Sequence, residues 1–424
     1  MMQARMALGL AALLVAAPML DSSGFLAARS EWPQFRGPQR DGVSRETGLL
    51  KQWPTDGPRL LWKTPNLGIG FSSIAIAGGR IFTMGDRRDA CYLCGLAEDT
   101  GRELWSVRVG RNGGNYAGPR CTPTVDGNLV FALGQHGDLL CVEAATGKER
   151  WRKNLPKDFG GQCGGWNYTE SPLVDAEKLV CTPGGGQATM LALDKNTGRT
   201  LWKCAVPDGD TAGYSSIVVA EVGVRQYVQL TAEGLIGVQA RDGKLLWTYG
   251  DSRDRYAGNT ANVPTPIVLD DHVFSSAGYG RGGGLIKLTA NGQHIQVNEI
   301  YFKPELTNKH GGLIQLGDHV YGDRDDSGSP FCVEAKTGKI AWRKNTRTKG
   351  EGSASIVAAD GHLYIRYSNG YVALVEASPA GYKEKGVFKI PNSDSNSWNH
   401  PVICGGRLYL REKDTLWCYD VKGG

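Results

Sequence analysis

The ten cysteines are the most reactive side chains in this sequence. Cys91 and Cys94 form its one C-x-x-C pair. The odd spacing places the two thiols on opposite faces of a strand, with no second pair and no histidine at ligand spacing. The pair therefore indicates neither a zinc nor a redox centre. Most cysteines lie in apolar, strand-like runs, which predicts small buried side chains, and disulfides remain the alternative.

Polar and aromatic side chains form a second candidate set, because they recur near the beginning of successive repeated segments. The polar members are Arg120, Glu170, Tyr214, Asn262, His310, Glu351, Asn399 and His400. Trp166 and Trp398 join them, each directly followed by asparagine. Such groups around a channel mouth predict a site for a small ligand, an ion or a peptide. The alternative is that they hydrate the mouth and cap strand ends.

Other kinds of chemistry find little support. The glycine-rich segments 110–118 and 278–284 are not followed by helical periodicity, so they do not indicate a nucleotide site. The net charge of +5 comes from no long basic block, which argues against nucleic acid as a partner. No Ser/His/Asp order can be read from the sequence, and the catalytic residues of any enzyme stay unassigned.

A repeat must position these side chains. Five copies end in Gly-x-x-x-Trp, at 99–105, 145–151, 196–202, 241–247 and 336–342. Each indicates an inner strand, a tight turn that needs the positive φ of glycine, and an outer strand whose indole packs on the neighbouring repeat. The tryptophans expected to pack between repeats are Trp62, Trp105, Trp151, Trp202, Trp247 and Trp342.

The spacing of the repeats predicts the fold. The interval from Trp247 to Trp342 is about two periods, so the segment 288–301 is a copy without tryptophan, and 375–388 is a second degenerate copy. Each repeat also begins with a hairpin, which gives four strands per repeat. The strand that the last repeat lacks is supplied near Trp62. We expect an all-β, eight-bladed propeller closed by the N-terminal strand, with seven blades as the alternative.

The N-terminal segment predicts export. Arg5 precedes an apolar run over 7–20, followed by small residues, which is typical of a secretory signal peptide. The run is shorter than the ~20 residues of a membrane-spanning helix, and a retained anchor is the alternative. We expect a signal peptide at 1–29, a leader at 30–58 and the propeller at 59–424. The mature protein would be a periplasmic or secreted monomer with no transmembrane anchor.

The repeat resembles the pyrroloquinoline-quinone (PQQ) repeat superfamily of eight-bladed propellers. The best match is LALDKNTGRTLW at 191–202, and the leader EWPQFRGPQRDGVS at 31–44 resembles that of exported members in planctomycete-type bacteria. The resemblance covers about 31–424. It implies either a quinone-dependent alcohol or sugar dehydrogenase or a propeller without cofactor, such as an outer-membrane assembly lipoprotein, because one fold carries several functions.

The dehydrogenase branch of that family implies PQQ and Ca²⁺ at the mouth. Glu170, Asn262 and Asp323 would then be the oxygen ligands of the metal, although acidic residues near Asp323 also suit a turn. The sequence departs from that branch, because it has no Cys-Cys dipeptide, no C-x-x-C-H motif and a shorter chain. We therefore expect a binding or assembly scaffold without cofactor, whose partner is an unknown protein or small molecule. A PQQ- and Ca²⁺-dependent dehydrogenase is the alternative.

Overall fold

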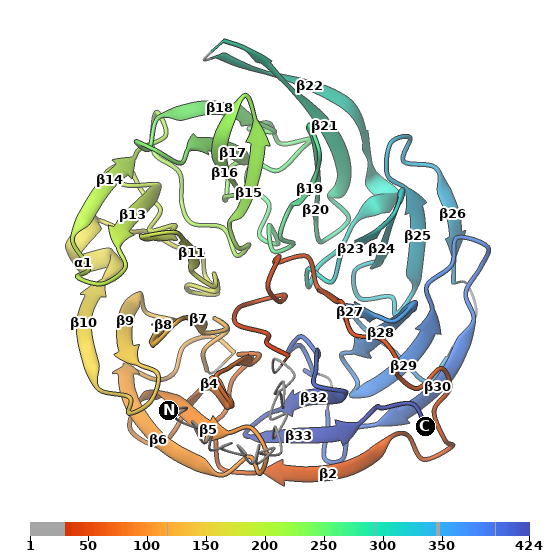
Figure 1. Ribbon diagram of the computed structural model, residues 1–424. Helices are drawn as coiled ribbons and strands as arrows, with labels where there is room; N and C mark the ends of the chain where they lie inside the picture. Colours follow the sequence, from red (N-terminus) through yellow and green to blue (C-terminus); the bar gives the residue numbers. More distant parts are fainter. Residues whose placement is uncertain (1–29, 117, 293, 345–347, 395) are drawn as a thin grey trace, which may run out of the picture.

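The computed structural model describes residues 30–116, 118–292, 294–344, 348–394 and 396–424. Eight β-sheets follow one another around a common centre, like the blades of a propeller (Figure 1). Seven sheets have four strands, and the eighth is a four-stranded blade with one added short strand. The prediction of an all-β propeller with eight four-stranded blades is confirmed, and the seven-bladed alternative is wrong.

The first four blades are continuous in sequence. Blade 1 consists of β3 (Ala75–Ala77), β4 (Arg80–Asp86), β5 (Cys91–Ala97) and β6 (Glu103–Gly110). Blade 2 consists of β7 (Thr124–Asp126), β8 (Leu129–Leu133), β9 (Asp138–Glu143) and β10 (Glu149–Asn154). Blade 3 consists of β11 (Leu173–Asp175), β12 (Lys178–Cys181), β13 (Met190–Asp194) and β14 (Thr200–Cys204). Blade 4 consists of β15 (Val218–Val222), β16 (Val224–Leu230), β17 (Leu235–Gln239) and β18 (Leu245–Tyr249).

Two of the remaining blades include a strand from the N-terminal part of the chain, β1 in blade 7 and β2 in blade 8. Blade 5 consists of β19 (Ile267–Leu269), β20 (His272–Ala277), β21 (Gly282–Asn291) and β22 (His294–Lys303). Blade 6 consists of β23 (Ile314–Leu316), β24 (His319–Asp323), β25 (Pro330–Glu334) and β26 (Ile340–Arg343). Blade 7 consists of β1 (Val43–Ser44), β27 (Ala354–Ala359), β28 (His362–Tyr367), β29 (Tyr371–Glu376) and β30 (Glu384–Lys389). Blade 8 consists of β31 (Val402–Cys404), β32 (Arg407–Glu412), β33 (Thr415–Asp420) and β2 (Arg59–Thr64).

The ring is closed by β2, as predicted. This strand pairs antiparallel with β33, and Arg59 lies opposite Asp420. The N-terminal strand thus completes the C-terminal blade and gives β33 a partner on its outer edge, which would otherwise be open to other chains. The hydrophobic core lies between blades rather than within one of them: Phe82, Phe131 and Leu191, from blades 1, 2 and 3, belong to one buried cluster.

The tryptophan of one blade packs on the turn glycine of the next. The indole of Trp105 in blade 1 lies over Gly147 in blade 2, where an added Cβ would be 2.6 Å from the ring. The indole N–H of Trp105 also donates to the carbonyl of Ala144 at 3.2 Å. The φ of Gly147 is +72°. Glycine is therefore required here both for the turn conformation and for the approach of the neighbouring indole.

The same contact recurs around the ring with local variations. The indoles of Trp62, Trp151 and Trp202 lie over Gly101, Gly198 and Gly243. Trp342 donates its indole N–H to the carbonyl of Ser378 in the following blade. Trp247 differs, because its indole N–H donates to Gln226 within its own blade, at 2.6 Å.

The two degenerate copies are completed in different ways. In blade 5, Tyr301 pairs with Leu285 just before a β-bulge, which is the register position of the tryptophan in blades 1 to 4. Its hydroxyl donates to the carbonyl of Ala335 at 2.6 Å, so the tyrosine replaces the missing indole. In blade 7 the same position is Gly386. The side chain of Trp53, from the leader, lies over this glycine.

The leader crosses the centre of the ring, where Figure 1 shows it as the red segment. Arg36 donates to the carbonyls of Gly311 at 2.9 Å and Leu313 at 2.5 Å, beside blade 6. Arg40 donates to the carbonyl of Ser171 at 2.7 Å, beside blade 3. Both guanidinium groups are buried. Residues 30–44 therefore bind to two sides of the ring near its centre, and β1 then pairs in parallel with β27.

Helices contribute little to the described residues. The α-helix α1 (Leu155–Phe159) begins after an Asn154 cap, and η1 (Pro304–Leu306) is a single 3-10 turn. Within the described ranges, no helix has the length and apolar character needed to cross a membrane. The predicted signal peptide, 1–29, lies outside the described residues and stays a prediction.

Candidate functional site

A cavity of about 180 Å³ lies at the mouth of the propeller, and Phe35 of the leader is one of the residues that line it. Its walls come from the segments that precede the innermost strands of seven blades. Seven aromatic rings line it, from Phe35, Phe71, Tyr116, Trp166, Tyr214, Tyr279 and Trp398. The leader therefore contributes to this site together with the blades.

The aromatic rings form two groups. Trp398 stacks on His310, with ring centroids 4.9 Å apart, and on Phe71, at 5.0 Å. Trp166 lies against Tyr214 at 5.1 Å and Tyr279 at 6.1 Å. The pocket thus offers two extended aromatic surfaces, which suit a flat or ring-shaped ligand.

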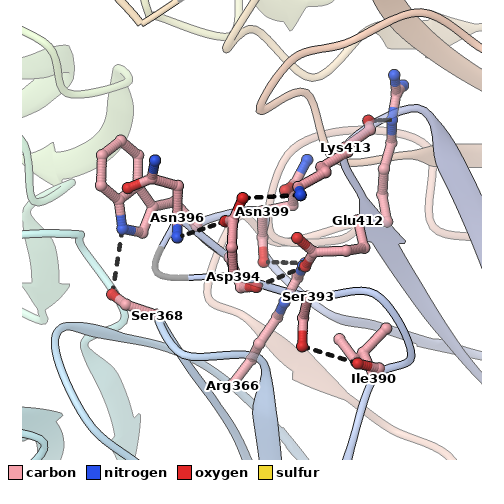
Figure 2. A network of polar contacts seen from close by, with 12 residues as sticks. Arg366, Ser368, Ile390, Ser393, Asp394, Asn396, Asn399, Glu412 and Lys413 are labelled. Carbon is pink, nitrogen blue, oxygen red and sulfur yellow. Dashed lines mark hydrogen bonds and ion pairs between the residues drawn. The ribbon is translucent and has the colours of Figure 1, made fainter.

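The orientation of Trp398 is fixed by its neighbours in the fold. Its indole N–H donates to the Ser368 hydroxyl at 3.1 Å, and the Ser368 hydroxyl donates to the carbonyl of Ser353 at 2.9 Å. Figure 2 shows Ser368 at one side of a polar network. The Ser368 carbonyl accepts from the backbone N–H of Ser397, and the Ser397 hydroxyl donates to Glu412, which also accepts from Arg366. The aromatic wall is therefore held by hydrogen bonds to blade 7 and not only by stacking.

The structure brings together six of the ten residues singled out from the sequence. Those that line the pocket are Arg120, Trp166, Tyr214, His310, Trp398 and His400. Glu170, Asn262 and Asn399 are buried behind the wall, and Glu351 is exposed at the entrance to blade 7. Ligand binding by any of the ten stays a prediction.

Three hydroxyl groups on the pocket wall were not singled out from the sequence. They form a ladder across blades 2 to 5: Ser171 accepts from the backbone N–H of Thr122, Ser216 from that of Ser171, and Thr265 from that of Ser216, at 2.9–3.2 Å. All three hydroxyls line the cavity. A signal existed, because Thr122, Ser171 and Thr265 are each followed by proline at the start of a blade.

The charges near the pocket are mainly positive. Burial lowers the pKa of His310 and of His400 to about 3, so both rings are neutral at physiological pH. Burial also lowers the pKa of Arg120 to about 10, which leaves its guanidinium protonated. Lys309 is neutralised by an ion pair with Asp326 at 2.7 Å. Arg120 is therefore a pocket cation with no ion pair among the described residues, although the charge of Asp86 acts on it.

Glu170 does not offset this charge at neutral pH. Its side chain is 2% exposed, and burial raises its pKa to about 8, although the nearby Arg40 acts in the opposite direction. One carboxylate oxygen accepts from the backbone N–H of Thr182 at 2.7 Å, and the other has no partner among the described residues. Glu170 is thus a buried residue behind the wall, and its hydrogen bond holds a strand end.

The residues present do not fit the Ca²⁺ site that the family resemblance implies. Asn262 uses its amide nitrogen on three backbone carbonyls, including those of Thr231 and Ala232. Asp323 accepts from Asn308 and from the backbone N–H of Ala354. Among the described residues, no group of three or more His, Cys, Asp or Glu side chains is arranged to hold a metal ion. A Ca²⁺ ion requires six to eight converging oxygen ligands, and these side chains are already used by the fold.

All ten cysteines, which lie within the described ranges, are unpaired. Nine are buried, and Cys163 is half-buried. Burial raises the pKa of the Cys94 thiol to about 11 and that of Cys121 to about 12. These thiols are core side chains of the blades, in keeping with the interpretation of the sequence.

The fold and the pocket together define a PQQ-repeat type of propeller with an aromatic mouth, and the comparisons identify the family. A family model described as "Outer membrane protein assembly factor BamB" matches residues 92–344, which is more than half of the chain. The protein belongs to this family of PQQ-repeat propellers.

Relatives with different names share this repeat or fold. The outer membrane protein assembly factor BamB of Burkholderia pseudomallei is 25% identical over 57% of this chain and 54% of its own length, so the match spans about half of that relative. The structure of BamB from Moraxella catarrhalis superposes with a TM-score of 0.59 at 16% identity, over 86% of this chain and 98% of that one. The quinohemoprotein alcohol dehydrogenase of Comamonas testosteroni gives 0.66 at 12% identity, over 93% and 81%. At these identities the two structures show the fold alone.

Proposed function

We propose that the protein is a binding or assembly scaffold of the cell envelope, in the periplasm or outside the cell, and that its partner binds at the mouth pocket. The observation that carries this proposal is the aromatic pocket beside the leader, where the half-exposed Tyr116 and Tyr279 mark the rim. Exposed aromatic rings around a concave site are typical of binding surfaces. The names of the outer-membrane assembly relatives support an envelope location.

A photo-crosslinking experiment tests the binding role. A benzophenone side chain in place of Tyr279, which is 52% exposed at the mouth, should label a partner when the exported protein is irradiated in cells. The matched control is Ile300, which is 47% exposed on the outer strand of blade 5. Labelling at Tyr279 and not at Ile300 is the expected result. Equal labelling at both positions would contradict a site at the mouth.

A PQQ-dependent dehydrogenase is the second candidate function. It is favoured by the two aromatic surfaces, which suit a planar quinone, and by the fold shared with a quinohemoprotein alcohol dehydrogenase. It is opposed by the use of the predicted ligands Glu170, Asn262 and Asp323 in hydrogen bonds of the fold. In addition, no group of three or more His, Cys, Asp or Glu side chains among the described residues is arranged to hold a metal ion. Purified protein incubated with PQQ and Ca²⁺ should show no cofactor uptake at micromolar concentration. Stoichiometric uptake, with dye reduction by short alcohols or sugars, would overturn the scaffold proposal.

A further inference from the structure

The hydroxyl ladder provides hydrogen-bond donors that the fold leaves unused. Ser171, Ser216 and Thr265 each accept a backbone N–H. The Ser171 hydroxyl also has a side-chain hydrogen bond with the Cys121 thiol, whereas no hydrogen bond donated by the Ser216 or Thr265 hydroxyl is found in the described part of the chain. Their residues are only 2–3% exposed, yet all three line the cavity. A buried hydroxyl without an acceptor is unfavourable, so this wall favours a ligand rich in hydrogen-bond acceptors.

Arg120 adds a positive charge to the same pocket. Its guanidinium donates to the backbone carbonyls of Gly118 at 3.0 Å and Tyr116 at 2.8 Å. No carboxylate of the described residues lies within ion-pair distance of it, and neither aspartate nor glutamate lines the cavity. Its position is close to the ladder, because Thr122, two residues further on, donates to Ser171. The positive charge of Arg120 therefore favours a ligand with an anionic group.

The rest of the pocket limits the ligand's size and shape. Aromatic surfaces flank the cavity, and the volume of about 180 Å³ is similar to that of an engineered cavity of ~150 Å³ that holds benzene. The pocket is therefore large enough for one six-membered ring. An aromatic cage of this kind can also attract an organic cation, but Arg120 would repel one.

We infer that the mouth pocket binds a small organic anion with one carboxylate on a single six-membered ring, the ring packing on the aromatic walls and the carboxylate accepting from Arg120 and the hydroxyl ladder. This inference rests on the proposed binding function of the mouth. The shared chemistry is found in both aromatic acids and sugar acids, which differ in whether the ring is flat or carries hydroxyl groups.

Calorimetric titration of the full exported protein tests the inference. The probes are benzoate and glucuronate, with benzyl alcohol and glucose as neutral partners and benzylamine as the cation. At least one acid should bind about tenfold or more tightly than its neutral partner, as expected for hydrogen bonds to a charged group. Binding of benzoate alone identifies an aromatic acid as the ligand class, and binding of glucuronate alone identifies a sugar acid.

Variants identify the responsible residues. Arg120→Gln should weaken acid binding about tenfold or more, while Arg120→Lys keeps the charge and should weaken it less. Because Arg120 also holds the loop before blade 2, Thr265→Val is a second variant that removes one hydroxyl and keeps the shape. Arg241→Gln, at a side chain 78% exposed on the outer turn of blade 4, is the matched control and should leave binding unchanged.

Three results would overturn the inference: equal affinity for acid and neutral partners, unchanged acid binding in both pocket variants, or no binding of any probe at millimolar concentration. These outcomes are distinguishable from failure of the proposed function. If crosslinking at Tyr279 persists while the acids do not bind, the mouth remains a binding site for another class of partner.

Discussion

The side chain of Trp53 lies directly over Gly386, where an added Cβ would be 2.6 Å from the Cβ of the tryptophan. The backbone N–H of Trp53 donates to the carbonyl of Lys385 at 3.0 Å, and its indole packs against Phe388, with centroids 5.3 Å apart. Gly386 holds the register position that tryptophan holds in blades 1 to 4. The leader therefore supplies from outside the blade an aromatic ring that the outer strand of blade 7 lacks.

Removing this ring should destabilise the propeller. Trp53 is 4% exposed, and Trp53→Ala should lower the free energy of unfolding by ~3–5 kcal/mol, the usual loss for a buried aromatic side chain. Urea unfolding followed by circular dichroism measures the change. Trp166→Ala, at the mouth, serves as the control and should cost less. Equal losses would mean that Trp53 has no special role in blade 7.

The turn glycines allow their two contributions to be separated. Gly243 and Gly361 have the same φ of +76°, but a Cβ at Gly243 would lie 2.5 Å from the indole of Trp202, whereas one at Gly361 would meet nothing within 4 Å. Gly243→Ala should therefore lower the thermal midpoint more than Gly361→Ala, which pays only the backbone strain of roughly 1–2 kcal/mol. Similar thermal midpoints for the two variants would show that the indole of Trp202 can move aside without loss of stability.

A buried ion pair lies behind the mouth, at the centre of Figure 2. Arg366 and Glu412 are 2.7 Å apart and 0% and 3% exposed, and Arg366 also donates to the carbonyl of Asn399 at 2.9 Å. Arg366→Met or Glu412→Leu alone should cost ~3–5 kcal/mol, because each leaves a buried charge unpaired. The double variant should be more stable than either single one in the same urea experiment. A double variant less stable than both would indicate that the pair itself stabilises the fold.

Glu170 predicts a pH dependence of stability. Its pKa rises from the ordinary 4.5 to about 8 in the folded protein. As pH rises from 4.5 toward 8, the unfolded chain releases this proton while the folded protein retains it, so stability falls across this range. Glu170→Gln removes the effect, and its thermal midpoint should exceed that of the unaltered protein at pH 8 but not at pH 4.

The exposed Glu351→Gln is the matched control for this pH series, because Glu351 lies at the entrance to blade 7 and is open to solvent. It should follow the unaltered protein at every pH. A Glu170→Gln midpoint that runs parallel to that of the unaltered protein would show that Glu170 is ionised in the folded state.

The repeat made the blades predictable, because Gly-x-x-x-Trp records a contact that recurs at a fixed distance along the chain. Trp105 over Gly147 is such a contact. The contact of Trp53 with Gly386 does not recur along the chain, and its two residues are more than three hundred positions apart. No repeated spacing therefore indicates it. The contacts of the leader arginines were unpredictable for the same reason, because nothing in the spacing of the sequence indicates that Arg36 donates to the carbonyl of Gly311.

The candidate site was harder to predict, because at a blade entrance the same residue type can either bind a ligand or hold a strand end through a hydrogen bond. Glu170 and Asp323 looked like oxygen ligands, but each accepts a backbone N–H and holds a strand end. Arg120 and Trp398 do line the pocket. In the hydroxyl ladder, Ser171 and Thr265 precede a proline but Ser216 does not. Only the assembled ring shows that the three residues share one wall.

The leader's place in the ring has a consequence for biogenesis. Residues 30–64 leave the ribosome before any blade exists, yet Arg36, Trp53 and β2 contact blades 6, 7 and 8. Each of these contacts must wait until its own partner blade has been synthesised, since loop closure over such a span cannot precede its partner. Each interior blade can form as it emerges, but the assembly is sealed only when the oldest segment docks onto the youngest.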